Sequence, residues 1–496
     1  MGKTGSLGDL RFHVASGIVA GIGACSATSQ RKRKSKNGCS QCCLGRGLVH
    51  QARINEKCCE FPASNIDTVK ILVLGQGARE HAIVKALVRT GTAATDIIVA
   101  PGNAGIALEV RCEADLNPNL PLDVVKFALE HGTELVIVGP EAPLIAGVSD
   151  ALRSEGIAVF GPSQAAAQLE GSKSFAKEVM AAAGVPTGMA RECSNIEEVI
   201  DAMDDFGAPY VIKADGLAAG KGVIVTSDRD AAIEHAMKFI SMGILVEEFL
   251  DGQEVSLFFL SDGHSVLPLT PAQDFKRAYD NDEGPNTGGM GAYSPLPWLP
   301  EGFVQEVEDT VALPTINEMA RLGAPFVGLL YCGLIMTKRG LRVIEFNARF
   351  GDPETQVVLR RLNSSLSNLL YKSASGHLET TSDPEFSKDV AITVVLASEG
   401  YPDTSAPNRP IYGIGDAEAT GVEVCHASTE KKVDDNKGVE NKDGEEALMA
   451  TGGRVLSVVA TGKDFAGARA QAYAGIEKIQ LRGSHYRKDI AKKVAQ

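Results

Sequence analysis

The chain has 496 residues, 44% of them hydrophobic and 23% charged, which excludes a wholly disordered chain and a bundle of membrane-spanning helices. At about 150 residues per domain, this length predicts about three domains rather than one small module. The net charge of -14 leaves no basic excess to neutralise phosphates, so we expect neither a nucleic-acid partner nor a membrane partner.

The first 66 residues differ in composition from the rest. Residues 1–60 contain ten Lys or Arg against three acids, a local charge of +7, whereas the remainder carries -21. Their apolar stretch, residues 14–24, is too short to cross a bilayer. We interpret residues 1–66 as a disordered, removable transit peptide, for a plastid rather than a mitochondrion. A secretory signal is the alternative, but the basic run at residues 31–36 favours organelle import.

Six of the ten cysteines lie in this leader. Cys39 and Cys42 have the spacing of a zinc half-site, but Cys58 and Cys59 are adjacent and cannot supply the other half. The other four cysteines are scattered singly and predict no disulfide framework, which fits a reducing compartment.

Residues 67–168 have the rhythm of a parallel sheet. Apolar strands are expected at residues 69–74, 96–100, 134–138 and 157–160, with room for a crossover helix between each pair. Each strand ends in a turn that contains glycine, at the edge where open α/β sheets place their ligands. We therefore expect an N-terminal βαβ domain that binds substrate, with Asn103 in the turn after the second strand.

The first turn, from Gly75 through Gly77 and Arg79, does not match a dinucleotide-binding motif. Glu80 stands where the third glycine is required, and no acid follows the second strand. The turn predicts only an anion site made by backbone N–H groups and a helix N-terminus, with Arg79 adding charge. A plain structural turn is the alternative.

A second domain is expected to start near Leu169, with a helix from Gly171 to about Ala183. An apolar stretch then leads Lys213 into a loop, which offers backbone donors and two cations to a polyphosphate. The loop residues of interest are Gly216, Gly220, Lys221 and Gly222. It is not a Walker A loop, because Gly222 stands where Ser or Thr is needed. A hairpin with solvated lysines is the alternative.

Two later strands carry acids. Residues 244–250 end in an acidic turn, which can hold an adenine with its backbone and a ribose with a carboxylate. Residues 342–347 alternate, so we expect Val343, Glu345 and Asn347 on one face. A carboxylate and an amide oxygen on one face suit a hard cation such as Mg²⁺, whereas a solvent-facing strand is the alternative.

Residues 284–295 contain four glycines and few aliphatic side chains, so we expect a ligand-approaching loop and no core element. Together with residues 349–354 and the terminal residues 486–490, this motif resembles the phosphoribosylamine-glycine ligases, also called glycinamide ribonucleotide synthetases. These are ATP-grasp enzymes of purine biosynthesis. The resemblance runs from about Val69 to Asp489, with several long motifs in the same order.

The resemblance implies a multidomain α/β and α+β fold. It comprises the N-terminal parallel βαβ domain at 67–168, a two-lobed ATP-grasp domain at 169–388 with its small lobe at about 186–252, and a small mixed C-terminal domain at 389–496. It implies that ATP phosphorylates glycine to glycyl phosphate, which the amine of 5-phosphoribosylamine then attacks. The oligomeric state does not follow from it, and a monomer is compatible.

The resemblance also implies roles for the residues already described. The catalytic residues would be Lys213, Arg349 for the glycine carboxylate and Asp274 for the ammonium group. The ATP-binding residues would be Lys173, Lys213, Gly216, Gly220, Lys221, Gly222, Glu247, Glu248, Leu250 and Glu254. Phosphoribosylamine and glycine would meet Gly75, Gly77, Arg79, Asn103, Gly288, Gly289 and Asp352. Mg²⁺ or Mn²⁺ would bind Glu345 and Asn347.

Three positions depart from the family pattern. The Phe-Gly-x-Ala-Gly loop before the adenine strand is missing, because the chain passes from Gly243 directly into Ile244. Phe275 stands where the family has histidine after Asp274, and Ala78 replaces a first-turn glycine. A catalytically impaired ATP-binding relative, or another ATP-grasp ligase, therefore remains an alternative.

Overall fold

The computed structural model describes residues 69–216, 222–406, 408–431 and 448–496. The expected transit peptide, together with Gly220 and Lys221 of the glycine loop, lies outside the described residues. None of the described helices is long and apolar enough to span a membrane.

The N-terminal sheet has five parallel strands in the order β3-β2-β1-β4-β5. Its strands are β1 Ile71–Gly75, β2 Ile97–Pro101, β3 Arg111–Cys112, β4 Leu135–Val138 and β5 Ala158–Phe160. Leu72 and Leu74 enter one hydrophobic core while Ile71 and Val73 enter another, so the sheet is buried on both faces. This burial explains the continuous apolar runs in the sequence, and the prediction of a parallel βαβ sheet is confirmed.

Helices follow the strands of this sheet. They are α1 Ala78–Arg89, α2 Pro121–Glu130, α3 Glu141–Ile145 and α4 Val148–Ser154, then α5 Gln168–Gly171 and α6 Lys173–Ala183. Ser172 caps the N-terminus of helix α6, because its Oγ accepts from the backbone N–H of Phe175 at 3.1 Å. The helix is followed by Gly184, which has a φ of 69°. Glycine adopts this left-handed backbone conformation at little energetic cost. The local start and stop signals in the sequence therefore suffice for this helix.

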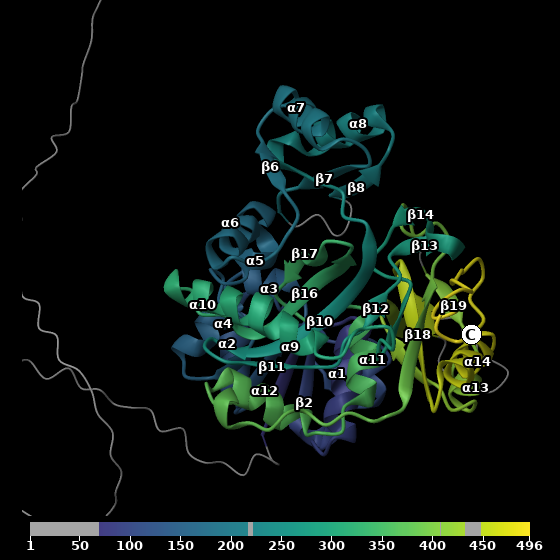
Figure 1. Ribbon diagram of the computed structural model, residues 1–496. Coiled ribbons are helices and arrows are strands. Elements are labelled where there is room, and N and C mark those ends of the chain that lie inside the picture. The colour runs from purple at the N-terminus through teal and green to yellow at the C-terminus, as the bar shows by residue number, and fades with distance from the viewer. Residues whose placement is uncertain (1–68, 217–221, 407, 432–447) are drawn as a thin grey trace, which may run out of the picture. The chain divides into compact units, whose positions relative to one another are not determined.

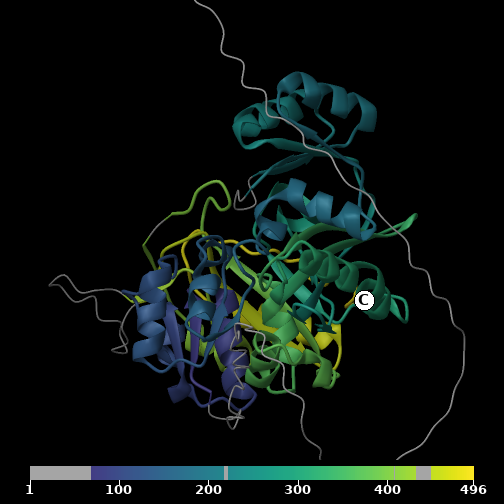
Figure 2. The same ribbon diagram turned by 90° about the vertical axis from the view of Figure 1, so that its left-hand side faces the viewer.

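The small lobe has its own sheet and its own core. Its strands, in the order β6-β9-β7-β8, are β6 Ala190–Cys193, β7 Tyr210–Ala214, β8 Val223–Thr226 and β9 Ile244–Glu247. Helices α7 Ile196–Phe206 and α8 Arg229–Phe239 cover one face of this sheet (Figures 1 and 2). Ile212 and Val246 of the sheet pack with Val199 and Ala236 of these helices. The lobe thus closes a hydrophobic core although Gly243 passes directly into β9.

The large lobe has an antiparallel sheet in the order β11-β10-β16-β17. Its strands are β10 Gly252–Asp262, β11 Val266–Pro268, β16 Val327–Thr337 and β17 Gly340–Asn347. A β-bulge at Ile344 interrupts β17, since Leu334 pairs with Val343 but the neighbouring Gly333 pairs with Glu345. The expectation that Val343 shares a face with Glu345 is therefore wrong: Val343 is buried in the core.

A fourth sheet joins strands from distant parts of the chain in the order β12-β15-β18-β23-β20. These are β12 Gln273–Asp274, β15 Gly291–Ser294, β18 Val390–Ala397, β23 Arg454–Gly462 and β20 Glu423–His426. All four residues of β15 are buried, so the expectation that residues 284–295 contain no core element is wrong. A Cβ at Gly291 would lie 2.7 Å from the carbonyl oxygen of Thr393, which shows how closely the backbones pack.

The remaining strands form two smaller sheets: β13 Arg277–Tyr279 with β14 Glu283–Asn286, and β19 Arg409–Ile411, β22 Leu448–Ala450 and β21 Thr429–Lys431. The remaining helices are α9 Phe303–Val307, α10 Leu313–Arg321, α11 Glu354–Arg361, α12 Leu366–Ala374, α13 Ile414–Glu418 and α14 Phe465–Ile476. A π-helical segment, Glu308–Ala312, joins α9 to α10. Short 3₁₀ segments lie at Ala94–Asp96, Ile106–Leu108, Ile240–Met242, Asp280–Asp282 and Leu378–Thr380.

Candidate active site

A cavity of about 920 Å³ brings together residues from all along the described chain. Its lining includes the turn after β1, the start of α6, the end of β7, the end of β17 and the start of β23. This size suits a nucleotide with small substrates. The cavity is therefore the candidate active site, and the sequence-predicted residues can be placed relative to it.

Three lysines and one glutamate form a buried charged cluster in the cavity. Lys213 Nζ lies 2.9 Å from Glu247 Oε2, and Lys177 Nζ lies 3.5 Å from Glu247 Oε1. Lys173 Nζ donates to the carbonyl oxygen of Gly216 at 3.0 Å. Burial lowers the pKa of both Lys173 and Lys177. Two of these lysines hold a single carboxylate, so the cluster keeps positive charge that polyphosphate oxygens can neutralise.

The bulge in β17 places the expected metal ligands. Glu345 and Asn347 both line the cavity, whereas the side chain of Val343 is buried in the core. The extra residue, Ile344, presents its carbonyl oxygen to Lys213 Nζ at 3.2 Å. The described residues contain no cluster of three or more His, Cys, Asp or Glu arranged for a metal. Two protein oxygens beside a polyphosphate pocket nevertheless fit Mg²⁺ or Mn²⁺, because phosphates and water complete such a coordination shell.

The glycine loop is described only at its two ends. Gly216 and Gly222 both line the cavity, and Ala214 N–H donates to the carbonyl oxygen of Gly222 at 2.7 Å. Gly216 has a φ of 108°, a backbone conformation in which a residue with a side chain would be strained.

Three residues expected at the nucleotide do not line the cavity: Glu248, Leu250 and Glu254. The carboxylate of Glu248 accepts from Met189 N–H at 3.0 Å and pairs with Arg339 at 2.8 Å. Glu254 pairs with Lys276, whose charge holds the pKa of Glu254 below its ordinary value. These two carboxylates are therefore occupied by protein groups.

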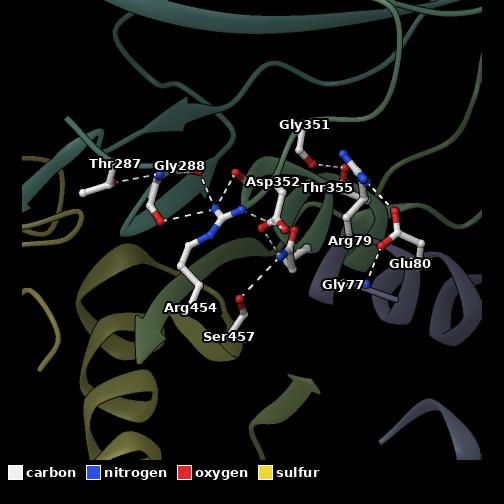
Figure 3. A network of polar contacts seen from close by, with 12 residues as sticks. Gly77, Arg79, Glu80, Thr287, Gly288, Gly351, Asp352, Thr355, Arg454 and Ser457 are labelled. Atoms are coloured by element: carbon white, nitrogen blue, oxygen red, sulfur yellow. Dashed lines mark hydrogen bonds and ion pairs between the residues drawn. The ribbon is translucent and has the colours of Figure 1, made fainter. Parts of the chain in front are cut away.

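The turn after β1 contains its own anion. Gly77 N–H donates to Glu80 Oε2 at 2.6 Å, and Arg79 Nε donates to Glu80 Oε1 at 2.6 Å (Figure 3). Gly75, Gly77 and Arg79 line the cavity as expected, but Glu80 fills the position proposed for an external anion. The Glu80 carboxylate therefore satisfies the N–H group of Gly77 at the N-terminus of α1.

Asn103 does not line the cavity. Its amide donates to the carbonyl oxygens of Gln76 and His426, both at 2.8 Å, and its Oδ1 accepts from Gly105 N–H at 2.9 Å. These hydrogen bonds connect the turns after β1 and β2 to the end of β20, so the role of Asn103 is structural.

Arg349 lies in the cavity between two glutamates. Its Nη2 is 2.9 Å from Glu170 Oε1, and its Nε is 3.4 Å from Glu141 Oε2. Glu170 also accepts from Ala348 N–H at 2.7 Å, and burial raises the pKa of Glu170. An incoming carboxylate would therefore share the guanidinium with these glutamates.

Gly288 and Asp352 line the cavity and are held by Arg454 (Figure 3). Arg454 Nη1 donates to the carbonyl oxygens of Gly288 and Asp352, and Nη2 lies 3.2 Å from Asp352 Oδ2. Tyr401 Oη accepts from Gly288 N–H at 2.9 Å. Gly289 does not line the cavity, and a Cβ there would lie 2.3 Å from Pro353 Cδ. The glycine motif is thus fixed from two sides.

Asp274 lines the cavity, where burial raises its pKa to about 7. Lys276 Nζ lies 3.4 Å from Asp274 Oδ1. Sequence reasoning did not single out several other residues of the lining: Glu80, Glu170, Lys177, Lys276, Tyr331, Glu354 and Arg454. Only Glu354 carried a local signal, because it ends the motif that begins at Arg349.

Comparison with known families and proteins agrees with this arrangement. Three domain models of phosphoribosylglycinamide synthetase match in order: the N domain at residues 69–170, the ATP-grasp (A) domain at 171–355 and the C domain at 391–493. The phosphoribosylamine--glycine ligase of Leifsonia xyli subsp. xyli is 60% identical over 425 residues, which cover 85% of this chain and 99% of that protein. That of Streptomyces coelicolor is 54% identical over 433 residues, covering 86% and 100%.

A solved structure gives the same result. The crystal structure of phosphoribosylamine--glycine ligase from Thermotoga maritima is 30% identical, with a TM-score of 0.71, and covers 85% of this chain and 100% of that one. The chain therefore belongs to the phosphoribosylglycinamide synthetase family, and its central domain is an ATP-grasp domain.

Proposed function

We propose that this chain joins glycine to 5-phosphoribosylamine at the expense of ATP, forming glycinamide ribonucleotide, ADP and phosphate in purine biosynthesis. Family membership supports the reaction. The observation that carries it is the meeting of Lys213, Ile344 and Glu345 in one cavity, since a cation from the small lobe and an oxygen ligand from the large lobe then face one nucleotide.

The triphosphate of ATP would lie against Lys173 and Lys213, with Gly216 and Gly222, the two described ends of the glycine loop, beside it. Glu345 and Asn347 would hold Mg²⁺ or Mn²⁺, which neutralises charge on the transferred phosphoryl group. The lysine ammonium groups would also neutralise charge on the transferred phosphoryl group, because buried cations stabilise developing charge more strongly than solvated ones.

The two small substrates would lie toward the other end of the cavity. Arg349 would bind the glycine carboxylate and Asp274 its ammonium group, which their places in the cavity lining support. Phosphoribosylamine would meet Gly75, Gly77 and Arg79 on one side and Gly288 and Asp352 on the other. These assignments keep the nucleophiles and the γ-phosphate in one enclosed space.

Two bond exchanges complete the reaction. A carboxylate oxygen of glycine attacks the γ-phosphorus, and the bond to the bridging oxygen breaks to release ADP. The amine nitrogen of phosphoribosylamine then attacks the acyl carbon of glycyl phosphate, loses a proton, and expels phosphate with the former carboxylate oxygen. The protein must orient these groups and exclude water from the labile acyl phosphate.

The direct test is release of ADP by the full-length protein given ATP, Mg²⁺, glycine and freshly prepared phosphoribosylamine. We expect ADP and glycinamide ribonucleotide in equal amounts, and no product when either small substrate is omitted. Turnover with a different acid in place of glycine would indicate another ATP-grasp ligase. Binding of ATP without product would indicate an impaired relative, consistent with the short connection at Gly243.

We further propose that residues 1–66 deliver the protein to a plastid, with the mitochondrion as the alternative. The basic, acid-poor composition of residues 1–60 supports import. A fusion of residues 1–65 to a fluorescent reporter tests this proposal. Fluorescence confined to plastids is the expected result, and diffuse or secreted fluorescence would contradict it.

A further inference from the structure

Glu354 begins helix α11 and lines the cavity, yet only 3% of it is exposed. A buried carboxylate is costly unless donors or a cation compensate it. Its inner oxygen is compensated: Oε1 accepts from Tyr331 Oη at 2.9 Å and from Ser256 Oγ at 3.0 Å. The hydroxyl oxygens of Ser256 and Tyr331 also lie 2.9 Å apart, so the three buried groups are in mutual contact, with the two O–H groups available for the two hydrogen bonds to Oε1.

The outer oxygen, Oε2, accepts no hydrogen bond from the described part of the chain. Oε2 lies close to Gly351, which also lines the cavity. A Cβ atom on residue 351 would lie 2.6 Å from this oxygen. Gly351 therefore leaves open an approach to this oxygen that any side chain would narrow. The carboxylate is fixed on one side and available on the other.

The neighbouring cations are already engaged. Arg349 pairs with Glu141 and Glu170, and Lys276 pairs with Asp274 and Glu254. No ion pair between Glu354 and a cation occurs among the described residues. The charge of Glu354 thus lacks a close cationic partner in the described part of the chain, in a cavity that also contains the candidate carboxylate-binding residue Arg349.

We infer that Glu354 Oε2 binds the ammonium group of the amino-acid substrate together with Asp274, and that Ser256 and Tyr331 hold it in position. The inference rests on the proposed function, in which glycine is the substrate that brings a cation into this cavity. It gives the site a means to select an amino acid over a hydroxy acid, because a neutral hydroxyl leaves the Glu354 carboxylate without a counter-charge.

Calorimetric titration of the full-length protein with glycine and with glycolate, in the presence of ADP and Mg²⁺, tests the inference. Glycolate keeps the carboxylate and replaces the ammonium group by a hydroxyl. We expect Glu354→Gln to weaken glycine binding about 10-fold or more and to leave glycolate binding within about twofold. The control is Glu318→Gln, which removes a carboxylate paired with Arg321 outside the cavity and should leave both affinities unchanged.

Equal loss of affinity for both ligands, or no loss for either, would overturn the role of Glu354. Absence of glycine binding by the unsubstituted protein would overturn the proposed function as well, so the two failures are distinguishable. If Glu354→Gln does not fold, Gly351→Ala provides the second test, because its methyl group narrows the approach to Oε2 without changing a charge. It should weaken glycine binding more than glycolate binding, and the opposite order would contradict the inference.

Discussion

Lys213 on β7 donates to the carbonyl oxygen of Ile344 on β17 at 3.2 Å, which connects the small lobe to the strand that carries Glu345 and Asn347. The contact exists because Ile344 is the extra residue of a β-bulge. The bulge thus does two things: it turns Glu345 and Asn347 toward the cavity, and it supplies an acceptor for a buried lysine.

The metal assignment predicts a large loss of activity on removal of either ligand. We expect Glu345→Ala or Asn347→Ala to lower metal-dependent turnover at least about 100-fold, because charge on the transferred phosphoryl group is then less well neutralised. The assay is steady-state ADP release over a range of Mg²⁺ or Mn²⁺ concentrations. Near-normal rates would remove these residues from the metal site.

The buried pairs of Glu247 predict a loss of stability. Side-chain exposure is 6% for Glu247 and Lys213 and 13% for Lys177, so Glu247→Gln leaves two buried ammonium groups without a carboxylate. We expect the free energy of unfolding in urea to fall by about 3–5 kcal/mol. The control is Glu234→Gln, whose pair with Lys238 is exposed and should matter by less than about 1 kcal/mol. Equal effects of the two substitutions would contradict the prediction.

The contacts of Arg454 predict that its substitution raises KM for one substrate only. Its guanidinium bridges two carbonyl oxygens and the carboxylate of Asp352, a geometry that a lysine ammonium cannot reproduce. We expect Arg454→Lys to raise KM for phosphoribosylamine about 10-fold while KM for ATP stays unchanged. Arg469→Lys, on the same part of the chain but outside the cavity lining, should change neither. A rise in both KM values would mean that Arg454 has only a general structural role.

The lowered pKa of His426 predicts that the stability of the protein depends on pH. Burial, aided by the charges of His81 and Lys85, lowers its pKa from 6.5 to about 3. Between these two values the unfolded chain binds a proton that the folded chain does not, so this residue makes stability fall as pH decreases from 6.5 toward 3. Urea unfolding of His426→Gln should show a weaker decrease over that range than the unsubstituted protein. Parallel curves would refute the assignment.

Sequence patterns predicted the features that depend on local structure. The four expected strands of the first sheet lie within a residue or two of β1, β2, β4 and β5, because buried parallel strands are continuous apolar runs. Helix α6 ends at Gly184 as its stop signal indicates. Most residues expected in the site also line one cavity, since they belong to motifs at strand ends.

The features that were predicted incorrectly depend on contacts between residues far apart in the sequence. A one-residue bulge at Ile344 leaves no mark in the alternation, so the face of Val343 was predicted incorrectly. β15 looked like a glycine-rich loop, but it pairs with β18 about a hundred residues later, where small residues permit close packing. Asn103 was expected in a substrate-binding turn, and Glu80 was noted only as the residue that breaks a dinucleotide-binding motif. Their partners in the fold show that Glu80 caps a helix and that Asn103 holds a turn in place.

The transfer of an oxygen atom tests the proposed chemistry most directly. With glycine labelled by ¹⁸O in its carboxylate, ATP and phosphoribosylamine, mass spectrometry of the phosphate released by the full-length protein reports which bond breaks. Attack of the carboxylate on the γ-phosphorus predicts one ¹⁸O atom in each phosphate released. Unlabelled phosphate, accompanied by glycinamide ribonucleotide, would contradict the acyl phosphate route and with it the account of this cavity.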